Sequence, residues 1–287
     1  MKDPRKGVPF KAPAKINFGL RITERRTDGF HSIETVFHRV SLHDEITLEP
    51  NRKICVESTD AAAPSDASNI CYKAATLIQQ QTRIDAGVLI RLRKHIPVGA
   101  GLGGGSTDAA MILRELPGWW GTTVDEATLF NFALRLGSDV PFFLGQGSAL
   151  ARGRGEVLEY FKLDVPYVIL VCTPGISISS QWAYQHIAPR KSEKPDLRTL
   201  VQEGMKHPEV LRKEVVNDFE IPVYAAFPAI RELRDTLEQS GAVFASLSGS
   251  GSSVYGLFAN AHEAEAASQI VKARGCGTSF TPPHFRG

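Results

Sequence analysis

The sequence has 287 residues, of which 43% are hydrophobic and 22% are charged, so it is long enough to bury a full core and has the composition of a globular protein. Its 33 basic and 31 acidic residues give a net charge of +2, which is too balanced for a typical nucleic-acid-binding protein. No apolar run of about 18 residues is present to span a bilayer, so we expect neither a nucleic-acid nor a membrane partner.

The first half of the chain alternates between predicted strands and helices. Period-two patterns and β-branched residues predict strands at 15–20, 35–40, 45–49 and 87–93. Helical spacing predicts helices at 69–81, 106–116 and 123–136. Ser68 or Asn69 is expected to cap the first helix, Pro117 to end the second, and a capping box of Thr123 and Glu126 to begin the third.

The pattern changes after about residue 160. A buried strand is predicted at 165–172, helices at 228–241 and 261–273, and short strands at 244–247 and 254–258. The polar, Pro- and Lys-rich stretch 188–195 is predicted to be a mobile connection. The fold class is therefore predicted to be α+β, with two domains at residues 1–160 and 161–287.

Cysteine usage and the N-terminus bear on location. The four cysteines form no metal or redox motif, and the first residues lack the apolar stretch of a secretory signal. We therefore expect the protein to work in a reducing cytoplasm.

A glycine-rich loop connects the predicted strand at 87–93 to the helix that follows it. Five glycines fall within Gly99–Gly105. Glycine permits positive φ and removes the Cβ that would keep a ligand at a distance. Backbone N–H groups of the loop and the positive end of the helix dipole can then hold a polyphosphate.

Three other interpretations compete for this loop. Gly99–Gly104 matches the G-x-G-x-x-G pattern of dinucleotide folds, but no clear acidic residue follows at the required distance. Gly99–Ser106 aligns with a Walker A motif, but Gly105 stands where that motif requires lysine. A plain tight turn would rarely need so many glycines. Positive charge for a bound ATP must therefore come from Mg²⁺ and from distant side chains.

Three segments together resemble the GHMP kinases, a family that includes galactokinase, homoserine kinase and mevalonate kinase. They are Ala12-Pro-Ala-Lys-Ile-Asn17, the loop and helix start at Pro97–Ala110, and Leu247-Ser-Gly-Ser-Gly-Ser-Ser-Val254. The resemblance implies an N-terminal ATP-binding domain, a C-terminal domain, and an active site in the cleft between them.

Further segments resemble one branch of this family, which phosphorylates the 2-hydroxyl of the cytidyl diphosphate of methylerythritol in the non-mevalonate route to isoprenoids. These segments are Arg26-Thr-Asp-Gly-Phe-His31 with Glu34-Thr-Val-Phe37, Leu136-Gly-Ser-Asp-Val-Pro-Phe-Phe143, Pro174-Gly-Ile-Ser177 and Asn217-Asp-Phe-Glu220. The small-molecule substrate implied is therefore a cytidine diphosphate ester, with ATP and Mg²⁺ as cofactors.

The resemblance also implies roles for individual residues. Asp139 would accept the proton of the attacked hydroxyl, and Lys15 would keep that carboxylate ionised and offset charge on the transferred group. The implied ATP contacts are Pro97, Val98, Gly99, Ala100, Gly101, Leu102, Gly103, Gly104, Gly105, Ser106, Thr107, Asn69 and Lys94, and Ser106 is also the candidate metal ligand. The implied substrate contacts are Asn17, Phe30, His31, Tyr184, Ser248 and Gly249.

Several of these residues have ordinary structural interpretations as well. A helix cap explains Asn69, a lysine at a strand end explains Lys94, and packing explains Tyr184 equally well. The family often has tyrosine at the position of Phe30, which keeps the ring but lacks the hydroxyl. Phe30 therefore cannot make the hydrogen bond of that hydroxyl.

Other functions remain open from the sequence. A kinase of the same family that acts on mevalonate or homoserine is one alternative, although those substrates carry no cytosine for His31 to recognise. A non-catalytic GHMP-like sensor that binds ATP and a sugar is another, although such a protein need not keep Lys15 and Asp139. The oligomeric state is expected to be a monomer or a homodimer.

Overall fold

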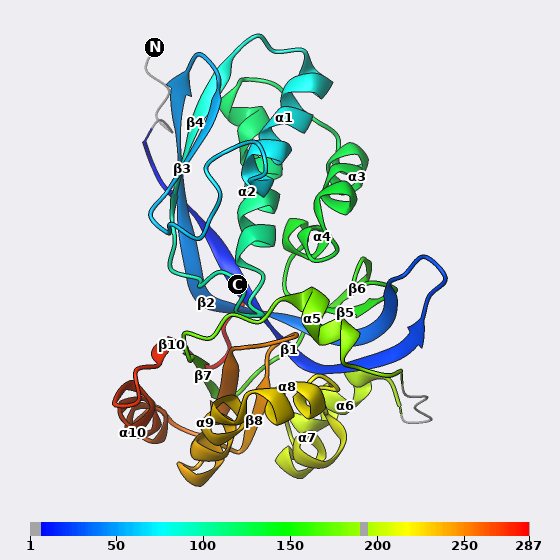
Figure 1. Ribbon diagram of the computed structural model, residues 1–287, viewed down its shortest axis with the longest axis vertical. Coiled ribbons are helices and arrows are strands. Elements are labelled where there is room, and N and C mark those ends of the chain that lie inside the picture. Colours follow the sequence, from blue (N-terminus) through cyan, green and yellow to red (C-terminus); the bar gives the residue numbers. More distant parts are fainter. Residues whose placement is uncertain (1–6, 190–194, 287) are drawn as a thin grey trace. The chain divides into compact units, whose positions relative to one another are not determined.

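The computed structural model describes residues 7–189 and 195–286. The chain forms two compact units (Figure 1). The first unit comprises Met1–Ala14, His43–Val98 and Gly103–Gln146, and the second comprises Lys15–Leu42, Gly99–Leu102 and Gly147–Gly287. Most of the predicted connection at 188–195 lies outside the described residues. The predicted boundary at residue 160 stays a prediction.

Two long strands contribute residues to both units: β1 (Phe10–Arg25) and β2 (His31–Asn51). The turn between them contains Gly29 at φ +85°, as the sequence predicts. The predicted strands at 35–40 and 45–49 are parts of one continuous strand, β2; between these ranges residues 41–43 are half-buried and Asp44 is buried.

The first unit places helices beside a small sheet. Strand β3 (Ile54–Ser58) runs parallel to β4 (Gly87–Arg93), and β4 pairs antiparallel with the end of β2. The helices of this unit pack on one another; they are α1 (Ile70–Thr82), α2 (Gly104–Trp119), α3 (Glu126–Leu136) and α4 (Val140–Leu144). Figure 1 shows these helices grouped together. Strand β4 matches its predicted range because its alternating side chains are buried on one side and exposed on the other.

The second unit contains two sets of paired strands. The part of β2 in this unit pairs with β1 and β5 (Ser148–Arg152), and β5 pairs with β6 (Val157–Phe161). A separate four-stranded antiparallel sheet has the order β10-β7-β9-β8. Its strands are β7 (Val168–Thr173), β8 (Phe244–Leu247), β9 (Val254–Phe258) and β10 (Gly277–Thr281).

The helices described in the second unit complete its core. They are α5 (Ser180–Gln185), α6 (Leu197–Gly204), α7 (Pro208–Glu214), α8 (Glu220–Ala226), α9 (Pro228–Gln239) and α10 (Ala261–Lys272). Helices α9 and α10 pack on the four-stranded sheet (Figure 1). The buried cluster includes Leu170 of β7, Leu237 of α9 and Val271 of α10. Among the described residues, no helix combines the length and apolar character needed to cross a bilayer.

Two predicted helix boundaries are wrong for identifiable reasons. Helix α2 continues past Pro117 to Trp119, and Pro117 is itself buried in the helix. Helix α3 is capped by Asp125, whose carboxylate accepts the N–H of Thr128 at 2.8 Å, so no capping box forms from Thr123. An aspartate cap two residues later satisfies the same orphan N–H groups.

Candidate functional site

The first half of the glycine-rich loop, Gly99–Leu102, belongs to the second unit and is fixed there by its carbonyl groups. Leu102 O accepts the backbone N–H of Lys15 at 3.0 Å, and Ala100 O accepts that of Ser253 at 3.1 Å. Gly99 O accepts the backbone N–H of Ile178 at 3.4 Å. The side chains of Ala100 and Leu102 are buried, so this half is anchored by backbone bonds and by two apolar side chains.

Gly101 in this half loop lies against the serine-rich loop that follows β8. Ser248 is fully buried, and its hydroxyl donates to Gly101 O at 3.0 Å. Gly101 has φ +76°, and a Cβ built there would lie less than 3.0 Å from the backbone oxygens of Ser248 and Gly251. Glycine is therefore required at 101 by both conformation and space. Ser248 is predicted from the sequence to contact substrate; the structure buries its hydroxyl against the glycine-rich loop.

The second half of the loop belongs to the first unit and begins α2. Gly103 is the N-cap in the left-handed region at φ +74°, and α2 has no side-chain cap. The backbone N–H of Thr107 is the first in α2 with a partner inside the helix, and it donates to Gly103 O at 2.9 Å. The backbone N–H groups before Thr107 have no partner inside the helix, because no helical carbonyl group precedes them. Gly105, in the same turn, is exposed. This turn offers the donors and dipole that an anion requires.

Lys94, a predicted ATP contact, lies between two carboxylates of the first unit. Its Nζ donates to Asp44 and, at 2.6 Å, to Asp108 Oδ2. The Lys94 side chain is only 5% exposed. Asp44 also accepts the backbone N–H groups of His95 and Ile96 at 2.6 and 2.8 Å. The three charged groups therefore join β2, the segment after β4 and the first turns of α2.

The pKa values of two groups in this cluster, Asp108 and Lys94, depart from their usual values. Burial raises the pKa of Asp108 to about 7, with Asp44 adding to burial and Lys94 opposing it. Burial opposes the charge of Lys94, but the two carboxylates together raise its pKa above the usual range. Asp108 therefore takes up a proton at a higher pH than an ordinary aspartate.

Three other predicted ATP contacts also lie in the first unit. Asn69 caps α1, because its Oδ1 accepts the N–H of Cys71 at 2.8 Å. Pro97 and Val98 are exposed on the loop after β4. The structure therefore shows the predicted helix cap at Asn69, and a contact of these residues with adenine or phosphate stays a prediction.

Lys15 and Asn17 lie two residues apart on β1 in the second unit and are both buried. Lys15 Nζ donates to Asn17 Oδ1 at 2.7 Å and lies 5.0 Å from the ring centroid of Phe37. A Cβ built on Gly249 would lie 3.4 Å from Lys15 Nζ and 3.3 Å from Asn17 Oδ1. The predicted residues Lys15, Asn17 and Gly249 are thus brought together.

Asp139 belongs to the first unit, at the N-terminus of the short helix α4. It is half-buried with helical backbone angles, and its side chain does not cap α4. Lys15 and Asp139 are assigned to different units, so their cooperation stays a prediction.

The predicted base-binding rings lie around the β1–β2 turn in the second unit. His31 stacks on Tyr184 with ring centroids 5.2 Å apart, and Tyr184 meets Phe219 edge-on at 4.9 Å. Phe30 is 51% exposed, with the guanidinium of Arg154 at 4.8 Å from its ring centroid. Burial and the nearby charge of Arg25 lower the pKa of His31, which favours the neutral ring. A neutral imidazole offers one donor and one acceptor.

Some residues that organise these segments were missed by reasoning from the sequence. Asn217 is buried and donates to the carbonyl oxygens of Leu247 and Gly249 at 2.9 and 2.8 Å, which holds the serine-rich loop. Asp44 and Asp108 were also missed. Two of the three had a signal in the sequence. Asp108 directly follows Thr107, a predicted ATP contact, and Asn217 lies in a segment that carried the family resemblance.

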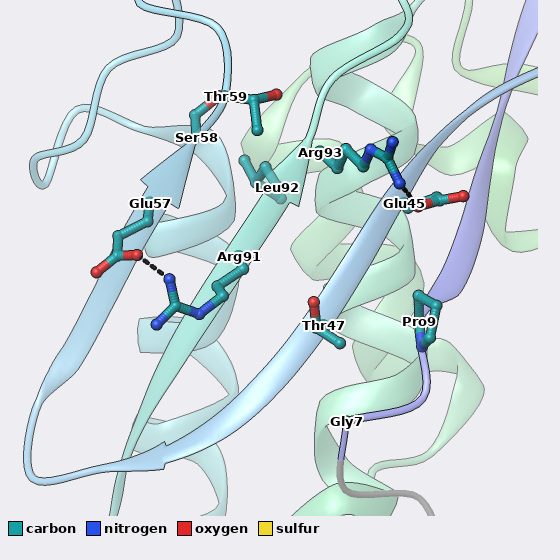
Figure 2. A pocket seen from close by; sticks show the side chains of 10 residues that line it. All are labelled: Gly7, Pro9, Glu45, Thr47, Glu57, Ser58, Thr59, Arg91, Leu92 and Arg93. Carbon is teal, nitrogen blue, oxygen red and sulfur yellow. Dashed lines mark hydrogen bonds and ion pairs between the residues drawn. The ribbon is translucent and has the colours of Figure 1, made fainter.

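An open cavity of about 450 Å³ lies in the first unit on strands β2, β3 and β4 (Figure 2). Its arginines are paired with glutamates: Arg91 with Glu57, and Arg93 with Glu45 at 3.3 Å. None of the predicted site residues lines it. The cavity therefore adds nothing to the candidate site.

Comparison with known proteins agrees with these features. The family model for the N-terminal domain of GHMP kinases matches residues 69–147, and the model for their C-terminal domain matches residues 197–275. A 4-diphosphocytidyl-2-C-methyl-D-erythritol kinase from Prosthecochloris aestuarii is 44% identical over 281 residues, which cover 97% of this chain and 98% of the relative. Another of the same name from Chlorobium limicola is 42% identical, with 97% and 98% covered.

Solved structures give the same result. A crystal structure of 4-(cytidine 5'-diphospho)-2C-methyl-D-erythritol kinase matches with a TM-score of 0.79 at 34% identity, covering 96% of this chain and 99% of that one. A homoserine kinase from Cytophaga hutchinsonii shares the fold, with a TM-score of 0.67 at 19% identity, covering 96% of this chain and 95% of that one. The chain therefore belongs to the GHMP kinases and, within that family, to the group of 4-diphosphocytidyl-2-C-methyl-D-erythritol kinases.

Proposed function

We propose that this protein transfers the γ-phosphoryl group of ATP to the 2-hydroxyl of 4-diphosphocytidyl-2-C-methyl-D-erythritol, a step of isoprenoid precursor biosynthesis. Nearly full-length identity to kinases of that name supports the reaction. The single structural observation that carries the choice of substrate is the ring surface at the β1–β2 turn. There, His31 stacks on Tyr184 beside the exposed ring of Phe30. Such a surface suits an uncharged base with donors and acceptors on its edge.

Phosphoryl transfer requires the acceptor hydroxyl to be aligned with the γ-phosphorus and to lose its proton. In the proposed reaction the substrate oxygen forms a bond to the γ-phosphorus while the bond to the β-phosphate oxygen breaks and ADP leaves. Asp139 accepts the hydroxyl proton. Lys15, whose ammonium is held by Asn17, offsets negative charge on the transferred group.

GHMP kinases use ATP, and the proposed phosphate site is the first turn of α2 with its uncapped N–H groups. A Mg²⁺ ion that accompanies ATP keeps phosphate and water ligands, so one protein hydroxyl suffices to hold it. Ser106 is half-buried in that turn and suits this role. The ion would neutralise phosphate charge. A cytoplasmic location and a monomeric or homodimeric state stay predictions.

The test is ADP release measured with three alcohols in parallel: the cytidyl substrate, mevalonate and homoserine. We expect turnover on the cytidyl substrate alone. Faster turnover on either of the other two would overturn the substrate, and no ADP release with any of them would favour a non-catalytic ATP-binding protein. Phosphorus NMR of the product decides whether the 2-hydroxyl is the position modified.

A further inference from the structure

A buried chain of hydrogen bonds connects Thr35 of β2 to Lys15 of β1 within the second unit. The Thr35 hydroxyl donates to Gly19 O at 2.6 Å. Asn17 Nδ2 donates to Thr35 Oγ1 at 2.9 Å, and Lys15 Nζ donates to Asn17 Oδ1 at 2.7 Å. Thr35 is 0% exposed, Asn17 is 1% exposed and Lys15 is 4% exposed, so protein atoms rather than bulk water satisfy these groups.

The direction of each bond follows from the one before it. A carbonyl oxygen only accepts, so the single hydrogen of the Thr35 hydroxyl is committed to Gly19 O. Thr35 Oγ1 can then only accept, and only the NH₂ side of the Asn17 amide can donate to it. The carbonyl side of that amide consequently faces the ammonium of Lys15. The opposite orientation would place an NH₂ group against an ammonium group.

Other contacts of these residues hold the backbone in place. The Tyr255 hydroxyl donates to the backbone oxygen of Asn17 at 2.9 Å, and the backbone N–H of Lys15 donates to Leu102 O at 3.0 Å. The ring of Phe37 lies beside the ammonium at 5.0 Å to its centroid. These contacts position the main chain and one side of the Lys15 ammonium. They do not determine whether the oxygen or the NH₂ group of the Asn17 amide faces that ammonium.

We propose that Thr35 is a positioning residue for phosphoryl transfer: its hydroxyl orients the Asn17 amide, which in turn aims the Lys15 ammonium. The inference rests on the proposed role of Lys15. It assigns Asn17 to holding Lys15, because both ends of its amide are engaged within the protein.

The decisive pair of variants is Thr35→Val and Thr35→Ser. Valine keeps the shape and removes the hydroxyl, whereas serine keeps the hydroxyl. Misaiming a group in the active site by about 1 Å can cost about 100-fold, so we expect Thr35→Val to lower kcat by about 10- to 100-fold. The KM for ATP should change by less than about twofold, since the ammonium is proposed to act in the transition state. Thr35→Ser should restore kcat.

A matched control lies on the same pair of strands. The exposed Thr23 donates its hydroxyl to Ser32 O at 3.1 Å and is not connected to Lys15. Thr23→Val should leave kcat unchanged. If Thr35→Val does not fold, Thr35→Cys, which has similar size and only a weak donor, should give a loss between those of serine and valine.

A double-mutant cycle separates this inference from the proposed function. Lys15→Met alone should abolish most turnover, and adding Thr35→Val to it should cost nothing further, because both changes act through one group. Wild-type kcat in Lys15→Met would refute the proposed role of Lys15, on which this inference rests, whereas the proposed function itself fails only if the wild-type protein does not turn over the cytidyl substrate. Loss of kcat in Lys15→Met with full kcat in Thr35→Val, or an additive loss in the double variant, would overturn only the role of Thr35.

Discussion

Lys94 Nζ lies 2.6 Å from Asp108 Oδ2, and neither side chain is more than 5% exposed. Asp44 completes the cluster from β2, so a single ammonium group serves two buried carboxylates. Cys71 of α1 is also buried and within electrostatic reach of all three groups. The cluster fixes the start of α2, the same turn that offers its N–H groups to phosphate.

Asp108→Asn should change how stability depends on pH. The pKa of Asp108 is about 7 in the folded protein and about 3.9 in an unfolded chain. The folded state therefore binds more protons between these values, and the free energy of unfolding contributed by Asp108 falls as pH rises from about 4 to about 7. Asparagine removes this loss, so the variant should gain stability relative to wild type across that window.

Urea denaturation at pH 5 and pH 8 measures the effect. His38 is buried with a pKa lowered to about 4 by burial, so its contribution has the opposite sign below pH 6.5. That contribution is common to both proteins and cancels in the difference. The raised pKa of Lys94 acts only above about 10.4. An equal stability difference at the two pH values would contradict the assignment to Asp108.

Two glycines of the same loop should respond differently to alanine. At Gly101 the new Cβ would meet backbone oxygens in a left-handed conformation, and we expect a loss of about 2 kcal/mol or more. At Gly105 the Cβ would lie 3.7 Å from Ile70 Cγ2, inside a helix, so the fold should keep its stability. Thermal unfolding of both variants makes the comparison.

For the two glycine variants, the KM for ATP distinguishes an effect on phosphate binding from an effect on folding. Gly105 is exposed at the start of α2, so a Cβ there should obstruct phosphate and raise the KM for ATP. An unchanged KM in a stable Gly105→Ala variant would count against this turn as the phosphate site.

Asp139→Asn should remove nearly all turnover while leaving ATP binding close to normal, because an amide cannot accept the hydroxyl proton. The matched control is Asp125→Asn, also an N-cap aspartate of the first unit. That change should affect stability alone, because the Asp125 carboxylate accepts hydrogen bonds from Thr128 at the start of its own helix. Single-turnover rates and ATP titration measure both quantities, and wild-type kcat in Asp139→Asn would remove it as the base.

His31→Ala should raise the KM for the cytidyl substrate by about tenfold and leave the KM for ATP unchanged, since a lost hydrogen bond to a base costs about 1 to 2 kcal/mol. His186 is the control, because it is also a histidine of the second unit stacked on an aromatic ring, Trp182, at 4.4 Å. His186→Ala should change neither KM. Equal effects of the two variants would argue against cytosine recognition by His31.

The sequence predicted correctly those strands and helix caps that depend mainly on neighbouring residues. The alternation of β4, the strands at 244–247 and 254–258, and the cap at Asn69 depend on neighbouring residues, and they were confirmed. The glycine-rich loop was recognised for the same reason.

Contacts between distant positions could not be predicted in this way. Nothing near Lys94 in the sequence indicates that Asp44, 50 positions away, and Asp108 would hold its ammonium. A strand-end lysine and a helix-start aspartate are common, and only the folded chain brings them together. The burial of the Ser248 hydroxyl against Gly101, 147 positions away, was missed for the same reason.

That last contact constrains how the sequence can diverge. Because a Cβ at 101 would lie within 3.0 Å of the Ser248 carbonyl oxygen, a side chain there is accepted only if the loop at 248–251 changes its path as well. The two segments are therefore expected to change together among related kinases. In a library that exchanges each segment independently between related kinases, the folded variants should be those that take both segments from the same parent.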